Sequence, residues 1–337
     1  MQIKVKCLFF KKLLLSITTI LSINYAEVVL ADDSALLSIK LAQQAYLNKD
    51  GKSIFKHIKN ALEISKNHPM ILKNVLKLYK VSESEKLFTD IKPDWSLPPE
   101  IKYLTVSAAR RYNSERGKVG FFMTASGQIP QANYIEQFQV IRYPNEIVLD
   151  KSANIGNWKE EHWGESLGFW TSSESKNTII EDGLYLLNIK VKDKNPVQAW
   201  FILNDASSSA SPVINLPKTN QEFITRTPSF IWKNFRSPES KNNEDRIRVS
   251  GKIRLDLPST TEDLVSVRFD YDPKKEIYQF KVGDHSQVKE YKGPDELPPG
   301  PYSFSVYFHE LQKFGDLWIG RNSSTKTSFQ IISENNK

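Results

Sequence analysis

The sequence predicts a mainly β protein, in which two tandem β-sandwiches follow a short α-helical segment. Before about residue 90, apolar residues recur at the three-to-four spacing of amphipathic helices. From residue 119 onward the period falls to two, and β-branched and aromatic residues dominate. This β region is long enough for two cores of about one hundred residues, which is the size of one sandwich. A composition of 39% apolar residues also excludes a wholly disordered chain.

The first 31 residues have the composition of a signal peptide. Four lysines between residues 4 and 12 precede an apolar run over residues 13–23. Small residues end the segment, so we expect cleavage after Ala31, with Ala26 as a second possible site. The alternative is a retained membrane anchor, but Asn24 and Glu27 interrupt the run before the roughly 20 apolar residues that span a bilayer. We therefore expect an exported protein, periplasmic or on the cell surface, with no transmembrane segment in the mature chain.

Cysteine usage limits the chemistry of the mature chain. The only cysteine, Cys7, lies inside the expected signal, so the mature protein would have neither disulfides nor thiolate metal ligands. Phosphate-binding glycine loops are also absent from the sequence. We expect no cofactor, and cores that are stabilised by packing alone.

The charge of the chain is concentrated on the helical segment. Removal of the signal lowers the net charge from +7 to +4, and residues 34–92 hold eleven lysines against five acidic residues. Residues 93–337 hold 31 basic and 31 acidic residues. A charge run is usually a solvated face, and the alternative is a contact with an anionic partner, either a lipid headgroup, an acidic glycan or a protein. Nucleic acid is not expected for an exported chain.

The helical segment, assigned to residues 32–92, is predicted to contain three helices between Ser34 and about Leu87. Residues 48–51 separate the first pair and residues 67–69 the second, where Pro69 can begin a helix but not continue one. The segment resembles the tetratricopeptide family in a run that contains Ala45-Tyr46, Asp50, Ala61-Leu62-Glu63-Ile64 and His68-Pro69. The resemblance covers about one and a half repeats, whereas arrays need about three. We expect a helical hairpin that packs on its neighbour.

Proline and serine mark the remaining boundaries. The proline-rich stretch 93–99 predicts a linker, and a helical turn is predicted at 101–106. We therefore assign residues 93–115 to a linker and a short helix. A Ser- and Ala-rich run at 205–212 divides a first sandwich, 116–211, from a second, 212–337. Alternation predicts strands at 134–141, 184–191, 200–203, 246–249 and 302–308.

Two features recur in both predicted sandwiches. Each has an aromatic strand that ends in tryptophan, at Phe169-Trp170 and at Phe230-Ile231-Trp232, and each has a late Gly-x-Tyr, at 183–185 and 300–302. In these features, and in the entry 212–217, the sequence resembles bacterial immunoglobulin-like and fibronectin type III domains. The resemblance implies that each Tyr lies on the penultimate strand and that its hydroxyl bonds back to the main chain. It is architectural and implies no active site.

The most specific match to a catalytic motif is Gly164-Glu165-Ser166-Leu167-Gly168, which fits the G-x-S-x-G nucleophile elbow of α/β-hydrolases. That elbow needs a strand, a tight turn and a helix, whereas strand and loop residues follow here. The five histidines are scattered, and alternation would place only Glu160 and His162 together, in what a solvated loop explains as well. We therefore predict no metal site and no enzyme; the alternative is a hydrolase of envelope glycans or esters with a site near His162 and Ser166.

Tryptophan supplies the candidate binding residues. Trp158, Trp163 and Trp170 fall within thirteen residues of polar sequence, and flat indoles beside polar groups suit a sugar-binding face. We expect Trp170 and Trp232 to lie in the cores, whereas Trp318 could lie in a core or at the surface. The candidate ligand-binding residues are Trp158, Trp163 and His162. The expected function is a non-catalytic exported envelope protein that binds a protein or glycan through its sandwiches; a second alternative to this is a structural component of an envelope assembly.

Overall fold

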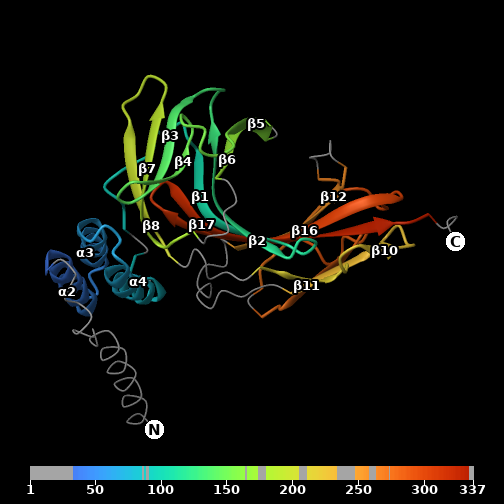
Figure 1. Ribbon diagram of the computed structural model, residues 1–337, viewed down its shortest axis with the longest axis horizontal. Coiled ribbons are helices and arrows are strands. Elements are labelled where there is room, and N and C mark those ends of the chain that lie inside the picture. Colours follow the sequence, from blue (N-terminus) through green and yellow to red (C-terminus); the bar gives the residue numbers. More distant parts are fainter. Residues whose placement is uncertain are drawn as a thin grey trace, which may run out of the picture. The chain divides into compact units, whose positions relative to one another are not determined.

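Figure 1 shows the computed structural model of the chain. The structure describes residues 33–85, 87–88, 91–163, 165–173, 180–204, 211–233, 247–257, 263–272 and 274–333. The expected signal, with Cys7, lies outside these residues, as do residues 205–210 of the predicted boundary at 205–212. None of the helices in the described part of the chain is both long and apolar enough to cross a membrane.

The three predicted helices are present as α2 (Asp33–Leu47), α3 (Gly51–Ile64) and α4 (Pro69–Ser84). Asp50 caps α3 by accepting a hydrogen bond from the Ser53 amide at 3.1 Å, and Pro69 occupies the first turn of α4. Together with residues 141–146 and 183–186, the helices form one compact unit, and the rest of the described β region forms the other.

Asn67 links the α3–α4 turn to two strand segments of the same unit. It is 3% exposed and has a left-handed φ of 59°. Its Nδ2 donates to the carbonyl oxygens of Tyr143, at 2.7 Å, and Leu184, at 3.3 Å, while its Oδ1 accepts from the Leu184 amide at 2.9 Å. The side chain lies so close to Gly183 that a Cβ there would sit 2.9 Å from Asn67 Oδ1. One buried amide therefore holds the helical segment to these strand ends.

Replacing Asn67 with glycine tests this link. Asn67→Gly keeps the left-handed backbone but removes the three hydrogen bonds, so we expect a loss of about 1–3 kcal/mol in the free energy of unfolding and faster hydrogen exchange at the Leu184 amide. Lys66→Gly is the control, because Lys66 is exposed and also has a positive φ, of 51°. Equal stability of the two variants would contradict the assigned role.

The remaining described chain is mostly β, and each predicted strand is confirmed within the described residues. The first eight strands are β1 (Tyr103–Asn113), β2 (Lys118–Ile129), β3 (Ile135–Arg142), β4 (Glu146–Asp150), β5 (Lys159–Trp163), β6 (Ser166–Ser172), β7 (Gly183–Val191) and β8 (Val197–Leu203). The other nine are β9 (Val213–Leu216), β10 (Gln221–Phe223), β11 (Ser229–Lys233), β12 (Ile247–Leu255), β13 (Val265–Phe269), β14 (Ile277–Lys281), β15 (Glu290–Lys292), β16 (Gly300–Phe314) and β17 (Leu317–Ile331).

These strands form two β-sandwiches with immunoglobulin-like strand order. In the first, the run β1-β2-β6-β5 packs on the sheet β4-β3-β7-β8, and Phe138 meets Phe169 across the core with ring centroids 5.5 Å apart. In the second, the sheet β14-β11-β9 packs on β13-β12-β16-β17, and Phe230 lies 4.6 Å from Phe304. Trp232 is fully buried in this second core, as predicted.

The expected tyrosine corner is confirmed in the second sandwich. Tyr302 lies on β16, the penultimate strand, is fully buried, and donates its hydroxyl hydrogen to the Pro298 carbonyl at 2.7 Å. Gly300, at the start of that strand, has a φ of +155°, a value that glycine adopts readily. In the first sandwich Tyr185 holds the equivalent position on β7 and is also buried.

The two sandwiches share one sheet. β1 pairs with β17 in parallel, from Leu104 opposite Leu317 to Asn113 opposite Lys326. This pairing joins the strands into a ten-stranded sheet of order β15-β13-β12-β16-β17-β1-β2-β6-β5, with β10 also on β17. Figure 1 shows β1, in teal, beside β17, in red. Two strands that would otherwise be open edges therefore satisfy each other's backbone hydrogen bonds.

The helical turn predicted at residues 101–106 is wrong. The chain enters β1 at Tyr103, and only a turn from the Pro98 carbonyl to the Ile101 amide precedes it. The spacing of Tyr103, Leu104 and Val106 resembles one helical turn, but β2 and β17 supply hydrogen-bond partners on both sides of this segment. Tertiary pairing outweighs a weak local preference here. The boundary between residues 211 and 212 remains a prediction.

A nicked chain tests the shared sheet. We expect that cleavage at a protease site inserted between Ser207 and Ser209 leaves two pieces that co-elute in native size-exclusion chromatography, because β1 and β17 remain paired across the cut. The pieces should separate only in denaturant. Separation in native buffer would show that the parallel pairing does not hold the sandwiches together.

Candidate ligand-binding groove on the shared sheet

Both smaller sheets pack on the same face of the ten-stranded sheet. Alternation along β17 shows this, because successive side chains point to opposite faces. Leu317 and Ile319 are buried beside Leu104 and Val106 of β1, and at the other end of the strand Phe329 and Ile331, which have the same parity, belong to the second core. Side chains of even number on β17 therefore lie on the opposite face, which neither smaller sheet covers.

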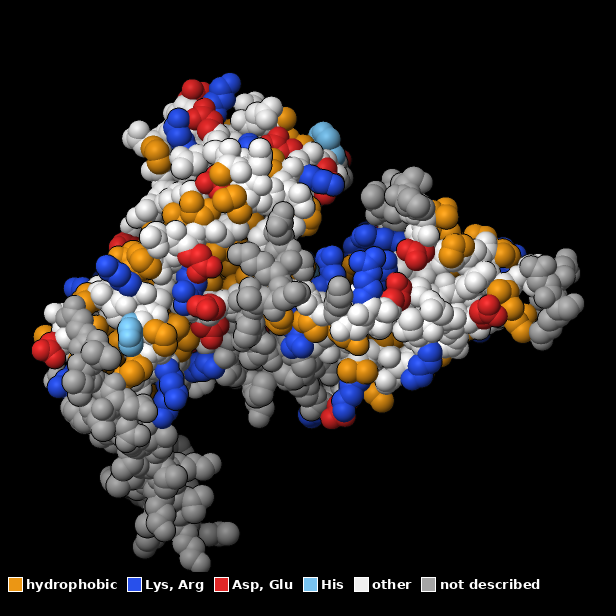
Figure 2. Space-filling model, in the orientation of Figure 1, with side chains coloured by type: hydrophobic (Ala, Val, Ile, Leu, Met, Phe, Trp, Pro, Cys, Tyr) orange, Lys and Arg blue, Asp and Glu red, His pale blue; other side chains and the backbone are white. Residues whose placement is uncertain are grey.

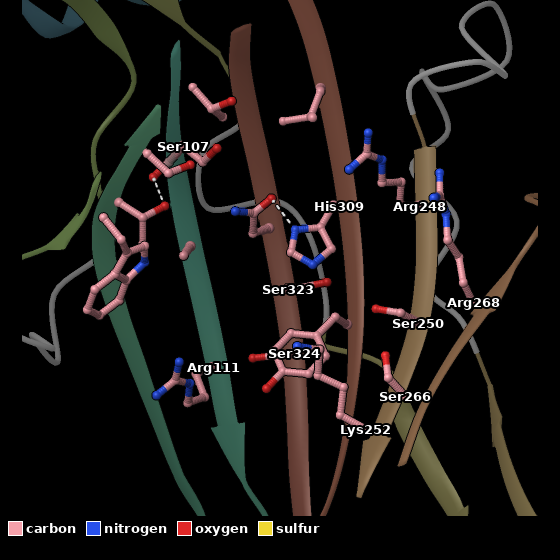
Figure 3. A pocket seen from close by; sticks show the side chains of 18 of the residues that line it. Ser107, Arg111, Arg248, Ser250, Lys252, Ser266, Arg268, His309, Ser323 and Ser324 are labelled. Atoms are coloured by element: carbon pink, nitrogen blue, oxygen red, sulfur yellow. Dashed lines mark hydrogen bonds between the residues drawn. The ribbon is translucent and has the colours of Figure 1, made fainter. Parts of the chain in front are cut away.

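The uncovered face forms a groove of about 470 Å³. Its walls are built from alternate residues of neighbouring strands, and Figure 3 shows these side chains rising from one side of the sheet. One row of directly paired residues crosses six neighbouring strands. Its members, in order across the sheet, are Glu290, Arg268, Ser250, Tyr307, Ser324 and Arg111. The pairing register therefore sets the spacing of charged and hydroxyl groups along the groove.

The groove is strongly basic. The cations on the uncovered face are Arg111, Arg248, Lys252, Arg268 and Lys292. Arg110 also contributes to the lining, but alternation along β1 turns its side chain to the opposite face. Among the described residues that line the groove, the one carboxylate is that of Glu290, which approaches Lys292 at 2.9 Å and Arg268 at 3.9 Å. Figure 2 shows Lys and Arg side chains gathered in a hollow of the surface beside β12. Such a concave basic surface concentrates anions from solution.

The cations differ in how well they are neutralised. Asp263 accepts hydrogen bonds from Lys252 and Arg254, and although burial raises the pKa of Asp263, these bonds hold it below its usual value. Lys252 is thus fixed by a permanent counter-charge. Arg111 and Arg248 are exposed and have no carboxylate within 4.0 Å in the part of the chain that the structure describes. These two guanidinium groups are the most available to a ligand.

Hydroxyl groups form the floor between the cations. Ser107 and Thr105 of β1 are 1% and 7% exposed, and neither side-chain oxygen has a hydrogen-bond partner among the described residues. Ser107 lies over Gly320, where a Cβ would sit 2.1 Å from its Oγ, so glycine leaves the room for this hydroxyl. Buried polar groups without partners are rare in folded proteins, and a water or a ligand would satisfy them.

His309 adds an uncharged polar group to the groove. Burial lowers the pKa of His309 to about 4, and the positive charges of Arg248 and Lys252 act in the same direction. Its Nδ1 lies 3.1 Å from Asn322 Oδ1, which can only accept, so Nδ1 carries the proton and Nε2 is left as an acceptor. At neutral pH this residue therefore contributes hydrogen bonding and no charge.

The shifted pKa of His309 predicts a pH dependence of stability. Its folded pKa of about 4 lies below the ordinary value of 6.5, so between these values the unfolded chain binds a proton that the folded chain does not. Stability is therefore lost as the pH falls from 6.5 towards 4. We expect His309→Gln to lose less in Tm than the unchanged protein between pH 7.5 and 4.5, whereas the exposed His285→Gln should follow the unchanged protein. Parallel Tm curves for all three would contradict this.

The structure places the predicted ligand-binding residues at the β5 end of the shared sheet, not in the groove lining. Trp158 is half-buried, stacks on Phe169 at 4.6 Å with an interplanar angle of 11°, and donates from Nε1 to Glu160 at 3.1 Å. His162 is exposed on β5. The side chain of Trp163 lies outside the described residues. A sugar-binding role for Trp158, Trp163 and His162 remains a prediction.

Trp170 was expected in the core, and this expectation is wrong. Its neighbour Phe169 is fully buried, so alternation along β6 turns Trp170 to the opposite face, where it is half-buried and lines the groove beside its pairing partner Ser126. Two adjacent aromatic residues on one strand cannot both face the same core. That parity was the signal in the sequence that could have identified a groove residue.

The structure does not bring together Ser166 and His162, the nucleophile and the base of the hydrolase alternative. His162 is paired with Leu167 in the β5–β6 hairpin, and directly paired residues point to the same face. Ser166 follows the opposite parity, so the two side chains lie on opposite faces. Strand β6 begins at Ser166 where the hydrolase elbow would need a helix. Within the described residues there is also no group of three or more His, Cys, Asp or Glu side chains that could hold a metal ion.

No protein-family model matches the sequence, and no curated protein matches it. Among solved structures, the chain is similar to the N-terminal Ig1-2 module of the Drosophila receptor protein tyrosine phosphatase DLAR, with 10% identity, a TM-score of 0.31, and coverage of 68% of this chain and 99% of the other. It is also similar to fibronectin(III)-like modules of CbhA from Clostridium thermocellum, with 9% identity, a TM-score of 0.20, and coverage of 68% and 93%. The assignment of the fold rests on the sheet order described above.

Proposed function

We propose that this chain is a non-catalytic, exported envelope protein that binds an anionic partner, a protein or a glycan, in the groove of the shared sheet. The observation that carries the proposal is the set of five cations, Arg111, Arg248, Lys252, Arg268 and Lys292, beside one carboxylate among the described residues that line the uncovered face of the sheet. Charge excess at this density attracts and orients anions. The signal-like N-terminus supports export.

Several features favour binding over the alternatives. The Ser166 and His162 side chains point to opposite faces of their hairpin, so the hairpin does not support their use as nucleophile and base. A role as a structural component was based on sandwich edges that pair with other chains; β1 and β17 pair with each other, and the end strands β5 and β15 of the large sheet keep this role as an alternative. The lysines of residues 34–92 offer a second contact surface for an anionic partner.

The proposal is tested by removing the two most available guanidinium groups. Protein that begins at Asp32 is immobilised and exposed to solubilised envelope, as unchanged chain and as Arg111→Ala/Arg248→Ala. We expect the amount of the specific partner retained by the double variant to fall by about tenfold or more, because a charge-assisted hydrogen bond contributes about 1.5–3 kcal/mol.

A matched control separates the groove from general charge. Lys218→Ala/Lys281→Ala removes the same number of cations from exposed positions that do not line the groove, and it should retain the partner as the unchanged chain does. If both double variants bind like the unchanged protein, the partner does not use the groove and the proposed site is wrong.

A further inference from the structure

We propose that the ligand of the groove is an acidic polysaccharide, bound across the strands between Arg268 and Arg111. This inference rests on the proposed function and adds the chemical class of the ligand. Three properties of the groove carry it: the separation of its cations, the hydroxyl groups between them, and the aromatic rings beside them.

The separation of the cations calls for an extended ligand with several acid groups. Arg268 lies on β13 and Arg111 on β1, at the two ends of a row in which three hydroxyl residues intervene. Adjacent strands are about 4.8 Å apart, so four steps between strands place these two backbones on the order of 19 Å apart. A single small anion cannot reach both. Figure 3 shows Arg111 at one side of the groove and Arg248 and Arg268 at the other.

The hydroxyl groups between the cations favour a sugar over an acidic protein. Serine is depleted at the centre of protein interfaces, whereas Ser250 and Ser324 flank Tyr307 in the middle of the row. Each hydroxyl both donates and accepts, which matches the donor and acceptor character of sugar hydroxyls. The unpartnered oxygens of Ser107 and Thr105 lie in the same floor.

Aromatic rings flank the hydroxyl floor. Trp170 is half-buried beside Ser126, and Phe122 lies under the Arg111 guanidinium, with 5.0 Å between the guanidinium carbon and the ring centroid. An exposed indole gives an apolar face for the C–H groups of a sugar ring, and a stacked guanidinium is held ready for bidentate bonds to a carboxylate or a sulfate. Cations alone would suit any anion, but cations, hydroxyls and an indole together suit an acidic glycan.

The test compares polymers that share charge but differ in backbone. Binding of the full chain from Asp32 is measured by calorimetry at fixed salt for heparin, polygalacturonate, poly-L-glutamate and neutral dextran. We expect at least one acidic glycan to bind about tenfold or more tightly than poly-L-glutamate at equal charge, and dextran not to bind. Tighter binding of heparin would assign sulfate as the recognised acid group, and tighter binding of polygalacturonate would assign carboxylate.

Two variants make the ligand class falsifiable. Trp170→Ala should weaken the bound glycan about tenfold and leave poly-L-glutamate unchanged, whereas Arg111→Ala/Arg248→Ala should weaken both; each variant is first shown to unfold at the temperature of the unchanged protein. Poly-L-glutamate that binds as tightly as the glycans, or a Trp170→Ala variant without effect, would overturn the glycan assignment while the anion-binding function stands. No binding of any polyanion would overturn the glycan assignment too, and the envelope retention test then decides the function separately.

Discussion

The parallel pairing of β1 with β17 is the interaction on which the rest of the β region depends. It joins an edge strand of each sandwich through ten residues of continuous register. The two sandwiches therefore share one long sheet, and each has its own smaller sheet packed on the same face of it. Tandem sandwiches joined only by a loop would expose those edges and leave their relative orientation free. The pairing removes both consequences.

Most of the fold could be predicted from the sequence, because the information was local. Helical spacing with clear breaks predicted α2, α3 and α4, and alternation with Gly-x-Tyr predicted β7 and β16. β1 was missed because the strand that stabilises one of its sides, β17, lies more than two hundred residues away. No local window contains that partner, so the short run at residues 101–106 was interpreted by its helix-like spacing alone.

The groove was missed for a related reason. Residues 93–337 hold 31 basic and 31 acidic residues, and this balance directed attention to the lysines of the helical segment. Charge balance along a chain says nothing of its distribution over a surface. The signal was present at finer scale, in strands that alternate apolar residues with basic or hydroxyl residues, such as Arg248, Ser250 and Lys252 on β12. This alternation can be interpreted as a groove only once it is known that both smaller sheets cover the opposite face of the large sheet.

The shared sheet thus links stability with the proposed recognition. A ten-stranded sheet that is covered on one face must be polar on the other, and polarity alone would be satisfied by any mixture of charges. Here the described residues of the uncovered face carry an excess of positive charge, buried hydroxyl groups and a half-buried indole. These groups come from both sandwiches, because Arg111 and Trp170 belong to strands of the first and Arg248 and Arg268 to strands of the second. Neither sandwich alone would hold the complete row, so the backbone pairing of β1 with β17 also assembles the proposed binding surface.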